Sequence, residues 1–276
     1  MLLGNEALDL RLTLIDSAQC FRWIERDGGF CCALEGKPVR LWRAEDGIHA
    51  EGDVDRARLR RYLDLDRDYG AIAAEYEGIP AARRAMALHP GLRVMNQPAW
   101  EALISFILSA NNNVGRITKL VAAISGRYGA DCGGLYAFPT PEALANAREE
   151  ELRALKVGYR AQFLIGTARR VCDGFPLEAL RGMPYEEAHA RLTTLPGVGD
   201  KVADCVLLFG CGQTEAFPVD VWVERLLTDW FGMRRGSRAA MAREARAMLG
   251  VHAGLLQQFL FHAIRVDGMR RDGVSK

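Results

Sequence analysis

The stretch LPGVGDKVADC, residues 195–205, predicts a tight connection between two helices. Amphipathic segments lie on both sides of it, at 186–195 and 201–210, with apolar residues at three- and four-residue intervals. Two glycines, Gly197 and Gly199, allow unusual backbone angles and leave neighbouring amide groups uncovered. Together with the N-terminus of the second helix, these amides form a candidate pocket for a phosphate. A plain turn between helices explains the same glycines, so the pattern leaves both interpretations open.

The chain changes character near residue 55. Before it, short and partly alternating segments are separated by turn residues, which is typical of a small antiparallel sheet. These segments are 8–14, 20–26, 30–36, 38–44 and 47–52. After it, helical periodicity predicts helices at 99–110, 115–129, 141–147, 149–155, 186–195, 201–210, 220–232, 238–249 and 254–266. We therefore expect an α+β fold, with a small N-terminal antiparallel β-sheet domain (1–80) followed by a larger α-helical domain (81–276) that contains a helix-hairpin-helix motif and to which the N-terminal segment can contribute.

Composition narrows the class of protein. The 276 residues are 49% hydrophobic and 26% charged, and no apolar run or N-terminal pattern predicts a membrane span or signal peptide. We therefore expect an intracellular monomer without a membrane partner, in the cytoplasm or nucleoid if the source is prokaryotic. Seven cysteines without a CxxC pair favour a reducing compartment over a disulfide framework or a zinc site. Because the net charge is only +1, nucleic-acid binding would depend on basic clusters such as 234–246 and 265–276.

Two residues stand where helices are predicted to begin. Lys201 lies in a first helical turn, where the positive end of the macrodipole disfavours an ammonium ion and favours the nucleophilic amine. Asp220 follows Pro218 and opens the next helix, where it is either a helix cap or a carboxylate that stabilises a developing cation. Since both lie at the starts of successive helices, they are candidates for one shared cleft.

These motifs resemble a known family. LPGVGDKVADC followed by PVDVWVERLL (218–227) is similar to the helix-hairpin-helix DNA glycosylases with a Gly/Pro...Asp loop. Further blocks resemble the 8-oxoguanine DNA glycosylase/lyase branch: SAQCFRW (17–23), SANNNVGRI (109–117), GYRAQFL (158–164) and LLQQFLF (255–261). Their order over residues 17–261 makes the resemblance specific. It implies a bifunctional enzyme that flips 8-oxoguanine out of duplex DNA, excises it and cleaves the strand.

The resemblance also implies roles for individual residues. Lys201 would attack C1′ of the damaged nucleotide and form a Schiff base, and Asp220 would stabilise the cationic sugar. The residues expected to contact the damaged base are Ala18, Cys205, Gln257 and Phe261. The residues expected to contact the orphan base and the DNA are Asn111, Arg116, Tyr159, Arg160, Gly197 and Gly199. The implied partner is double-stranded DNA that carries 8-oxoguanine opposite cytosine.

Two positions depart from the family pattern. Ala18 stands where the family commonly has glycine, and its backbone carbonyl is expected to accept the N7–H that 8-oxoguanine has and guanine lacks. Trp222 stands where animal relatives have a phosphate-contacting histidine. No metal site is expected, because the five histidines show no ligand spacing. No cysteine follows Cys211, which argues against the iron–sulfur cluster of related glycosylases; a structural monovalent cation at the hairpin carbonyls is compatible with the resemblance.

Two alternative functions remain open from the sequence. A monofunctional alkyl-purine glycosylase of the same fold would need Asp220 but not Lys201. A non-catalytic DNA-binding module would use the hairpin for phosphates alone, and would leave Lys201, Asp220 and Gln257 unexplained.

Overall fold

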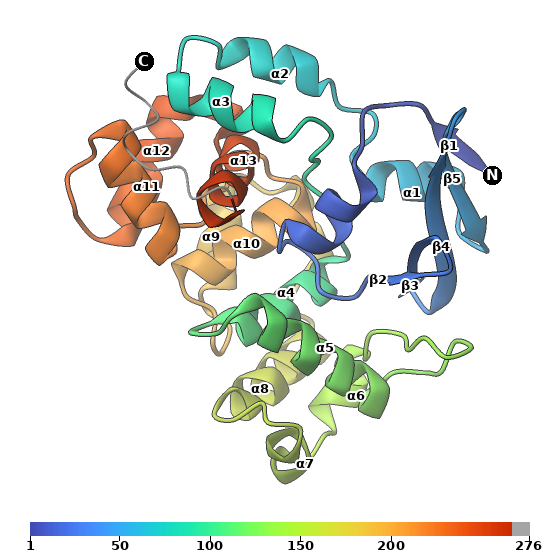
Figure 1. The fold of residues 1–276 in the computed structure, drawn as a ribbon. Helices are drawn as coiled ribbons and strands as arrows, with labels where there is room; N and C mark the ends of the chain where they lie inside the picture. The colour runs from blue at the N-terminus through green and yellow to red at the C-terminus, as the bar shows by residue number, and fades with distance from the viewer. Residues whose placement is uncertain (267–276) are drawn as a thin grey trace.

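An antiparallel sheet forms the N-terminal part of the molecule in the computed structural model, which describes residues 1–266 (Figure 1). Its strands, in chain order, are β1 (Leu2–Gly4), β2 (Ile24–Arg26), β3 (Gly29–Leu34), β4 (Lys37–Ala44) and β5 (Gly47–Gly52). They pair in the order β1-β5-β4-β3-β2. The long hairpin registers, such as Phe30 opposite Leu41 and Leu41 opposite Ala50, place alternate apolar side chains on one buried face.

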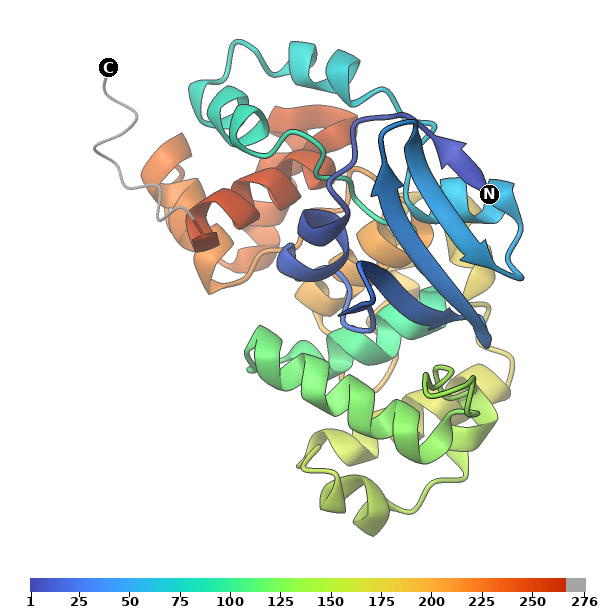
Figure 2. The ribbon, with the colours of Figure 1, turned by 45° about the vertical axis from the view of Figure 1, so that its right-hand side comes forward.

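Helices make up most of the remaining chain. They are α1 (Arg56–Tyr62), α2 (Tyr69–Glu75), α3 (Pro80–Leu88), α4 (Ala99–Ser109), α5 (Val114–Tyr128), α6 (Pro141–Ala145), α7 (Glu149–Ala154), α8 (Arg160–Cys172), α9 (Tyr185–Leu192), α10 (Asp200–Cys211), α11 (Val221–Phe231), α12 (Arg238–Leu249) and α13 (Ala253–Val266). Short helices of other types lie at η1 (Leu12–Asp16), η2 (Glu178–Gly182) and η3 (Gly250–His252). Figures 1 and 2 show α4–α8 on one side of α10 and α11–α13 on the other. The expected α+β architecture is confirmed.

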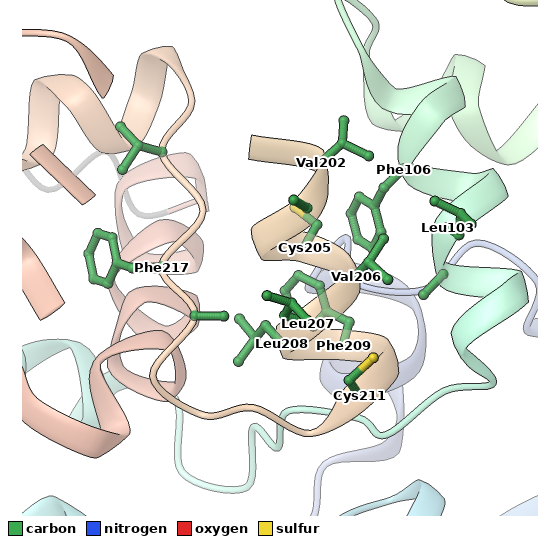
Figure 3. Close-up of a cluster of buried hydrophobic side chains, with 14 of the residues drawn as sticks. Leu103, Phe106, Val202, Cys205, Val206, Leu207, Leu208, Phe209, Cys211 and Phe217 are labelled. Atoms are coloured by element: carbon green, nitrogen blue, oxygen red, sulfur yellow. The ribbon is translucent and has the colours of Figure 1, made fainter. Parts of the chain in front are cut away.

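The helix α10 is the centre of the helical core. Its residues from Val202 to Cys211 are all buried, and Figure 3 shows them packed between α4 and the segment that carries Phe217. A Cβ atom on Gly210 would lie 2.9 Å from the Cβ of Ala102 and 3.1 Å from the Cα of Ala99. The absence of a side chain at Gly210 therefore lets α10 and α4 approach closely.

Two hydrophobic clusters divide the core. One joins the sheet to α1 and reaches from Leu3 to Leu65, with Met95 added from the helical part. The other fills the helical bundle and takes in Phe21, Ile72 and Tyr76 from the first eighty residues. The N-terminal segment thus contributes to the bundle, while a domain boundary at residue 80 stays a prediction.

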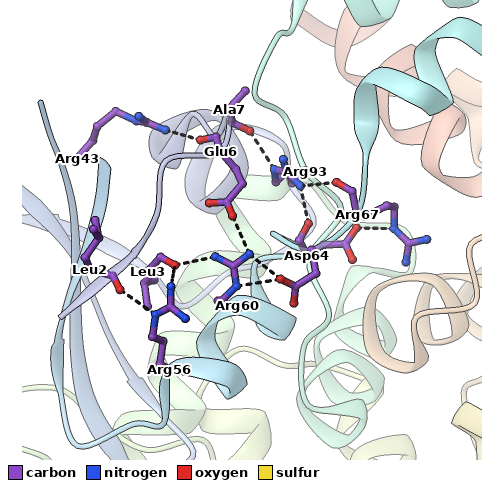
Figure 4. Close-up of polar contacts among 11 residues, drawn as sticks. Leu2, Leu3, Glu6, Ala7, Arg43, Arg56, Arg60, Asp64, Arg67 and Arg93 are labelled. Carbon is purple, nitrogen blue, oxygen red and sulfur yellow. Dashed lines mark hydrogen bonds and ion pairs between the residues drawn. The ribbon is translucent and has the colours of Figure 1, made fainter. Parts of the chain in front are cut away.

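Arginine side chains fasten the N-terminal strand to α1. Figure 4 shows Arg60 between the Leu3 carbonyl and the Glu6 carboxylate, each at 2.6 Å from its guanidinium group. Arg56 donates to the carbonyl of Leu2 at 2.9 Å. These bonds satisfy carbonyl groups of a short edge strand, which β-sheet pairing alone would leave open.

The prediction of a strand at residues 8–14 is wrong. This segment leads into η1, because Asp9 accepts hydrogen bonds from the amides of Leu12 and Thr13 through its side chain and carbonyl. The alternating leucines still bury Leu8, Leu10 and Leu14, so the same apolar pattern serves a different backbone. The strand predicted at 20–26 is confirmed only from residue 24 onward.

The segment Arg238–Arg265 is long and apolar enough, by length and composition, to cross a membrane. It is divided among α12, η3 and α13 by Gly250, which has φ +74°. In its most apolar window, 61% is buried inside the protein, as in the core helices of globular domains.

A buried ion pair joins the N-terminal segment to the helical part. Arg22 donates to Glu101 of α4 at 2.8 Å, and both side chains are only 4% exposed. Burial opposes the charge of Arg22, but the neighbouring Glu101 outweighs this effect and the pKa of Arg22 is raised. Each partner therefore depends on the other for compensation of its charge.

We predict that Glu101→Leu lowers the free energy of unfolding by about 3–5 kcal/mol, because Arg22 would stay buried without a counter-charge. Urea denaturation measures the change. Glu187→Leu, which breaks the exposed pair with Arg191, is the matched control and should change stability by less than about 1 kcal/mol. A Glu101→Leu protein as stable as the parent would contradict the prediction.

Candidate functional site

The hairpin between α9 and α10 consists of residues 193–199. Gly197 has φ +77°, and a Cβ there would lie 2.7 Å from Cγ of Phe163. Gly199 differs from the expectation: its φ of −100° is open to any residue, and a Cβ there would meet nothing within 4 Å. Gly197 is thus required by backbone angle and close packing, whereas Gly199 leaves the space in front of the α10 N-terminus open.

A cavity of about 830 Å³ lies beside this hairpin. Its walls come from the segment after η1, the end of α4 with the α4–α5 loop, and the N-termini of α10, α11 and α12, with α13 completing one side. The predicted site residues that line it are Ala18, Asn111, Gly197, Gly199, Lys201, Asp220 and Phe261. Segments separated by more than 240 residues in the chain therefore meet at one site.

Lys201 lies where α10 begins, against the C-terminal end of α4. Its Nζ atom donates to Oγ of Ser109 at 3.0 Å and lies 5.2 Å from the ring centroid of Phe106. The Ser109 hydroxyl in turn donates to the carbonyl of Phe106 at 2.7 Å. The hydroxyl and the ring thus hold the amine at the cavity wall without a carboxylate partner in any described ion pair.

Asp220 is the N-cap of α11. Its Oδ1 atom accepts from the amides of Trp222 and Val223, both at 2.9 Å. Among the described residues no hydrogen bond to Oδ2 is found. The carboxylate is thus fixed by one oxygen and lines the cavity, so the capping and chemical roles are compatible.

The predicted damaged-base residues differ in exposure. Phe261 lines the cavity and is partly buried, while Gln257, one helical turn before it on α13, is 4% exposed. The Oε1 atom of Gln257 is buried without a hydrogen-bond partner among the described residues. Cys205, one helical turn after Lys201 on α10, is buried. Burial raises the pKa of the Cys205 thiol to about 12, although the nearby lysine has a smaller, opposite effect. Neither Gln257 nor Cys205 lines the cavity in this structure, so their contact with a damaged base stays a prediction.

Ala18 has a left-handed backbone, with φ +60°. The segment around it is buried and densely hydrogen-bonded: the Gln19 side chain donates to the Arg93 carbonyl at 2.8 Å, and the Gln97 side chain donates to the Gln19 carbonyl at 2.7 Å. The Ser17 carbonyl accepts from Gln258 at 2.8 Å. In residues 1–266, by contrast, no hydrogen bond to the Ala18 carbonyl is found.

The predicted orphan-base residues surround the α4–α5 loop. Asn111 is exposed with φ +50°, and Tyr159 is 51% exposed, stacked edge-on against Phe163 with the ring centroids 6.0 Å apart. Arg116 is exposed, with one bond of 3.4 Å to the Lys156 carbonyl.

Arg160 is placed differently from these exposed residues. It is only 5% exposed, and its guanidinium group donates to the carbonyls of Ala110 and Asn111. Its carbon Cζ lies 4.5 Å from the ring centroid of Tyr159. In this structure Arg160 fixes the loop that carries Asn111, while a direct contact with a base stays a prediction.

Several site residues carry no local sequence signal. Ser109 is the partner of Lys201 across 92 residues, and Arg265 lines the cavity and donates to the Asp16 carbonyl. Asp204 also lines the cavity; burial raises its pKa to about 6, although a 2.6 Å hydrogen bond from Tyr185 opposes the shift. Only the three-dimensional neighbours reveal these roles.

The basic clusters predicted from the sequence contribute to the site only in part. Of the predicted basic cluster 234–246, Arg238 lines the cavity and pairs with Glu224 at 2.9 Å, whereas Arg246 is turned inward over the Tyr185 ring. Most of the cluster predicted at 265–276 lies outside the described residues. Within residues 1–266, no group of three or more His, Cys, Asp or Glu side chains could hold a metal ion.

Comparisons with known families match the whole length from residue 1 to residue 249. The model for the 8-oxoguanine DNA glycosylase N-terminal domain matches residues 1–103. The model for the HhH-GPD superfamily of base excision DNA repair proteins matches residues 104–249, which include the hairpin, Lys201 and Asp220. The cavity-lining residues therefore lie within the matched regions, except Phe261 and Arg265 of α13.

Two curated relatives are similar over part of their length. A probable N-glycosylase/DNA lyase of Methanothermobacter thermautotrophicus is 33% identical over 203 residues, which are 65% of this chain and 65% of the relative. An N-glycosylase/DNA lyase of Saccharomyces cerevisiae is 38% identical over 192 residues, covering 63% of this chain and 51% of the relative. The alignments thus span about half to two thirds of these relatives.

A solved structure is similar over nearly the whole chain. It is the Clostridium acetobutylicum 8-oxoguanine glycosylase/lyase in complex with double-stranded DNA containing cytosine opposite 8-oxoG. The two chains are 30% identical with a TM-score of 0.88, over 96% of this chain and 94% of the other.

We predict that alanine substitutions at the two hairpin glycines change different properties of the protein. Gly197→Ala should lower the free energy of unfolding by about 1–2 kcal/mol from the backbone alone, and further because Phe163 must move. Gly199→Ala should change stability by less than about 1 kcal/mol, because a Cβ there meets no neighbour, but should weaken binding to duplex DNA, because its methyl group would cover the amides that are expected to bind a phosphate. Urea denaturation and fluorescence anisotropy with a labelled duplex measure the two effects. Equal stability of both variants, or unchanged DNA affinity in Gly199→Ala, would contradict this division.

Proposed function

Because the chain belongs to the HhH-GPD superfamily of base excision DNA repair proteins, we propose that it is a bifunctional DNA glycosylase/AP lyase that excises 8-oxoguanine. The observation that carries the proposal is the convergence of Lys201 and Asp220 on one cavity beside the hairpin. The names of the relatives, N-glycosylase/DNA lyase and 8-oxoguanine glycosylase/lyase, support the same pair of activities.

The reaction requires a nucleophile and a stabiliser of positive charge. The Nζ atom of Lys201, as the neutral amine, forms a bond to C1′ of the nucleotide while the bond from C1′ to the base breaks, and the base leaves with the electron pair. Opening of the sugar and loss of an Nζ proton convert the adduct into a Schiff base. Removal of a C2′ proton then expels the 3′ phosphate by β-elimination. The Asp220 carboxylate stabilises the cationic character of the sugar through its uncapped oxygen.

Recognition of the lesion is assigned to the opposite wall of the cavity. The Ala18 carbonyl accepts the N7–H of 8-oxoguanine, whereas guanine has a lone pair at N7 that would face the carbonyl. Phe261 stacks on the flipped base, and Gln257 meets its pairing edge with the buried Oε1 that lacks a partner. Cys205 is assigned to the base contact by the resemblance alone, since in this structure it is buried and does not line the cavity.

Binding of DNA is assigned to the hairpin and the α4–α5 loop. The amides near Gly199 hold backbone phosphates without regard to sequence. Asn111 fills the hole left by the flipped base, and Tyr159 wedges beside the orphan base with its exposed ring. Arg116 and Arg160 are assigned to the edge of that base, where cytosine offers two adjacent acceptors.

The two alternative functions explain less of the site. A monofunctional alkyl-purine glycosylase has no use for an amine held on the cavity wall by Ser109. A non-catalytic DNA-binding module needs the hairpin but not the cavity of about 830 Å³ behind it. Both alternatives leave Lys201 without a function.

We further propose an oligomeric state, a compartment and a cofactor requirement for this enzyme. The enzyme would act as an intracellular monomer, in the cytoplasm or nucleoid if the source is prokaryotic, and its seven free cysteines are compatible with a reducing compartment. It needs no iron–sulfur cluster, and hairpin carbonyls would hold a structural monovalent cation.

We predict that Lys201→Gln abolishes the borohydride-trapped adduct and strand nicking on a duplex that carries 8-oxoguanine, while lesion binding persists. The amide that replaces the amine cannot form a Schiff base. Lys37→Gln, on the sheet and paired with Asp53, is the matched control and should trap normally. A normal yield of covalent adduct from Lys201→Gln would exclude this lysine as the nucleophile.

We also predict that excision opposite cytosine is at least about tenfold faster than opposite adenine, since an adenine amino group facing an arginine leaves buried donors unpaired, at about 1–3 kcal/mol each. Single-turnover excision from duplexes that differ only in the opposite base tests this. Arg116→Ala should remove preference with little loss of overall rate, whereas Arg160→Ala should also slow excision opposite every base, because it releases the Asn111 loop. Equal rates opposite cytosine and adenine in the parent would show that the arginines do not read the orphan base.

A further inference from the structure

The left-handed backbone of Ala18 requires support from its surroundings. An alanine at φ +60° is unfavourable relative to glycine, because its Cβ crowds the neighbouring carbonyl. Ala18 nevertheless lies in the cavity wall, so a change in its backbone conformation would alter the surface that a base would meet. Some other interaction must hold this conformation in place.

Two side chains of α13 supply such an interaction. Gln258 donates through Nε2 to the Ser17 carbonyl at 2.8 Å, and Arg265 donates through Nη2 to the Asp16 carbonyl. On the other side of Ala18, the Gln19 carbonyl accepts from Gln97 at 2.7 Å. The carbonyls on either side of Ala18 are therefore held by side chains from distant elements.

The burial of this arrangement makes it rigid. Ser17 and Gln19 are fully buried, and Gln258 is 2% exposed. Arg265 is half-buried between Asp16 and the ring of Phe261, whose centroid lies 5.6 Å from its Cζ atom. Hydrogen bonds in such surroundings exchange poorly with water, so breaking one leaves a buried carbonyl unsatisfied.

We propose that Gln258 and Arg265 are positioning residues for lesion recognition, which clamp the carbonyls of Ser17 and Asp16 and so hold the Ala18 carbonyl toward the cavity. This inference rests on the proposed function, because it assigns to the clamp the discrimination of 8-oxoguanine from guanine. Gln258 does not line the cavity and acts only through the backbone. Without the clamp, the strained alanine relaxes, and the carbonyl loses its alignment with N7–H of the base.

The clamp explains how alanine can serve at this position. A glycine at residue 18 would occupy the left-handed region without strain and would depend less on its neighbours. The alanine instead makes recognition conditional on the bonds from α13. This dependence predicts that residue 18 and residue 258 are energetically coupled, which a double-mutant cycle measures.

The test uses the full chain with Lys201→Gln as the parent, so that equilibrium binding can be measured without turnover. Two duplexes with 8-oxoguanine or guanine opposite cytosine give the discrimination ratio of their Kd values, and a duplex with a tetrahydrofuran abasic site reports binding without a base. Gln258→Met, which keeps the side-chain length but removes the donor, should reduce the ratio at least about fivefold and leave abasic binding unchanged. Gln213→Met is the matched control, because Gln213 also donates to two carbonyls, of Leu180 and Met183, and should keep the parent ratio.

A rescue variant separates positioning from general loosening of the fold. Adding Ala18→Gly to Gln258→Met should restore most of the lost discrimination, since glycine adopts the left-handed backbone unaided. If Gln258→Met does not fold, Arg265→Met is compared with and without Ala18→Gly, and only the loss that Ala18→Gly restores is assigned to the clamp, because Arg265 also lines the cavity beside Phe261.

The binding measurements distinguish failure of the clamp from failure of the proposed function. A parent that discriminates normally and a Gln258→Met variant with the same ratio would overturn the clamp alone. A loss that Ala18→Gly fails to restore would also overturn it, because the effect would not pass through residue 18. A parent that binds both duplexes equally would overturn the proposed function together with the clamp.

Discussion

The close packing of α10 against α4 is the constraint on which the site depends. Gly210 near the end of α10 lies against Ala99 and Ala102 near the start of α4, so the two helices touch without intervening side chains. Because the helices run in opposite directions, the start of α10 meets the end of α4, where Lys201 contacts Ser109. A buried contact of small residues thus sets the position of a polar contact roughly three helical turns away, at the mouth of the cavity.

Helix N-termini give the cavity its electrostatic character. The helices α10 and α11 both begin at its wall, with Gly199 leaving amides open on one and Asp220 occupying those of the other. The first N-terminus can therefore attract an anion, while the second fixes a carboxylate. Under the proposed function, the first would bind the phosphate backbone and the second would stabilise the cationic sugar of the nucleotide that loses its base.

The sequence predicted the parts of this structure that depend on local patterns. Turn residues beside alternating segments predicted β3–β5, and the spacing of the glycines, Lys201 and Asp220 predicted the hairpin and both helix starts. The strand predicted at 8–14 was wrong, because its leucines alternate as in a strand while Asp9 caps a helical turn. The helices α1, α2, α3 and α8 were absent from the expected helices, although Arg160 opens α8.

The rest of the site depends on contacts between distant residues. Ser109 is paired with Lys201 across 92 positions, and Gln258 is paired with Ser17 across 241. No periodicity or motif connects such positions, because the contact depends on how helices pack rather than on local spacing. The left-handed conformation of Ala18 was equally hidden, since alanine is not typical of that region.

The anchoring of the α4–α5 loop by Arg160 has a consequence for the energetics of the search along DNA. Asn111 already has its left-handed backbone, and the carbonyls before and at this residue are bound to the guanidinium group. Ordering a flexible loop residue on binding would oppose association by about 1–2 kcal/mol of backbone conformational entropy. A loop ordered in advance avoids this loss at every encounter, so under the proposed function Asn111 would enter the duplex without a further ordering step.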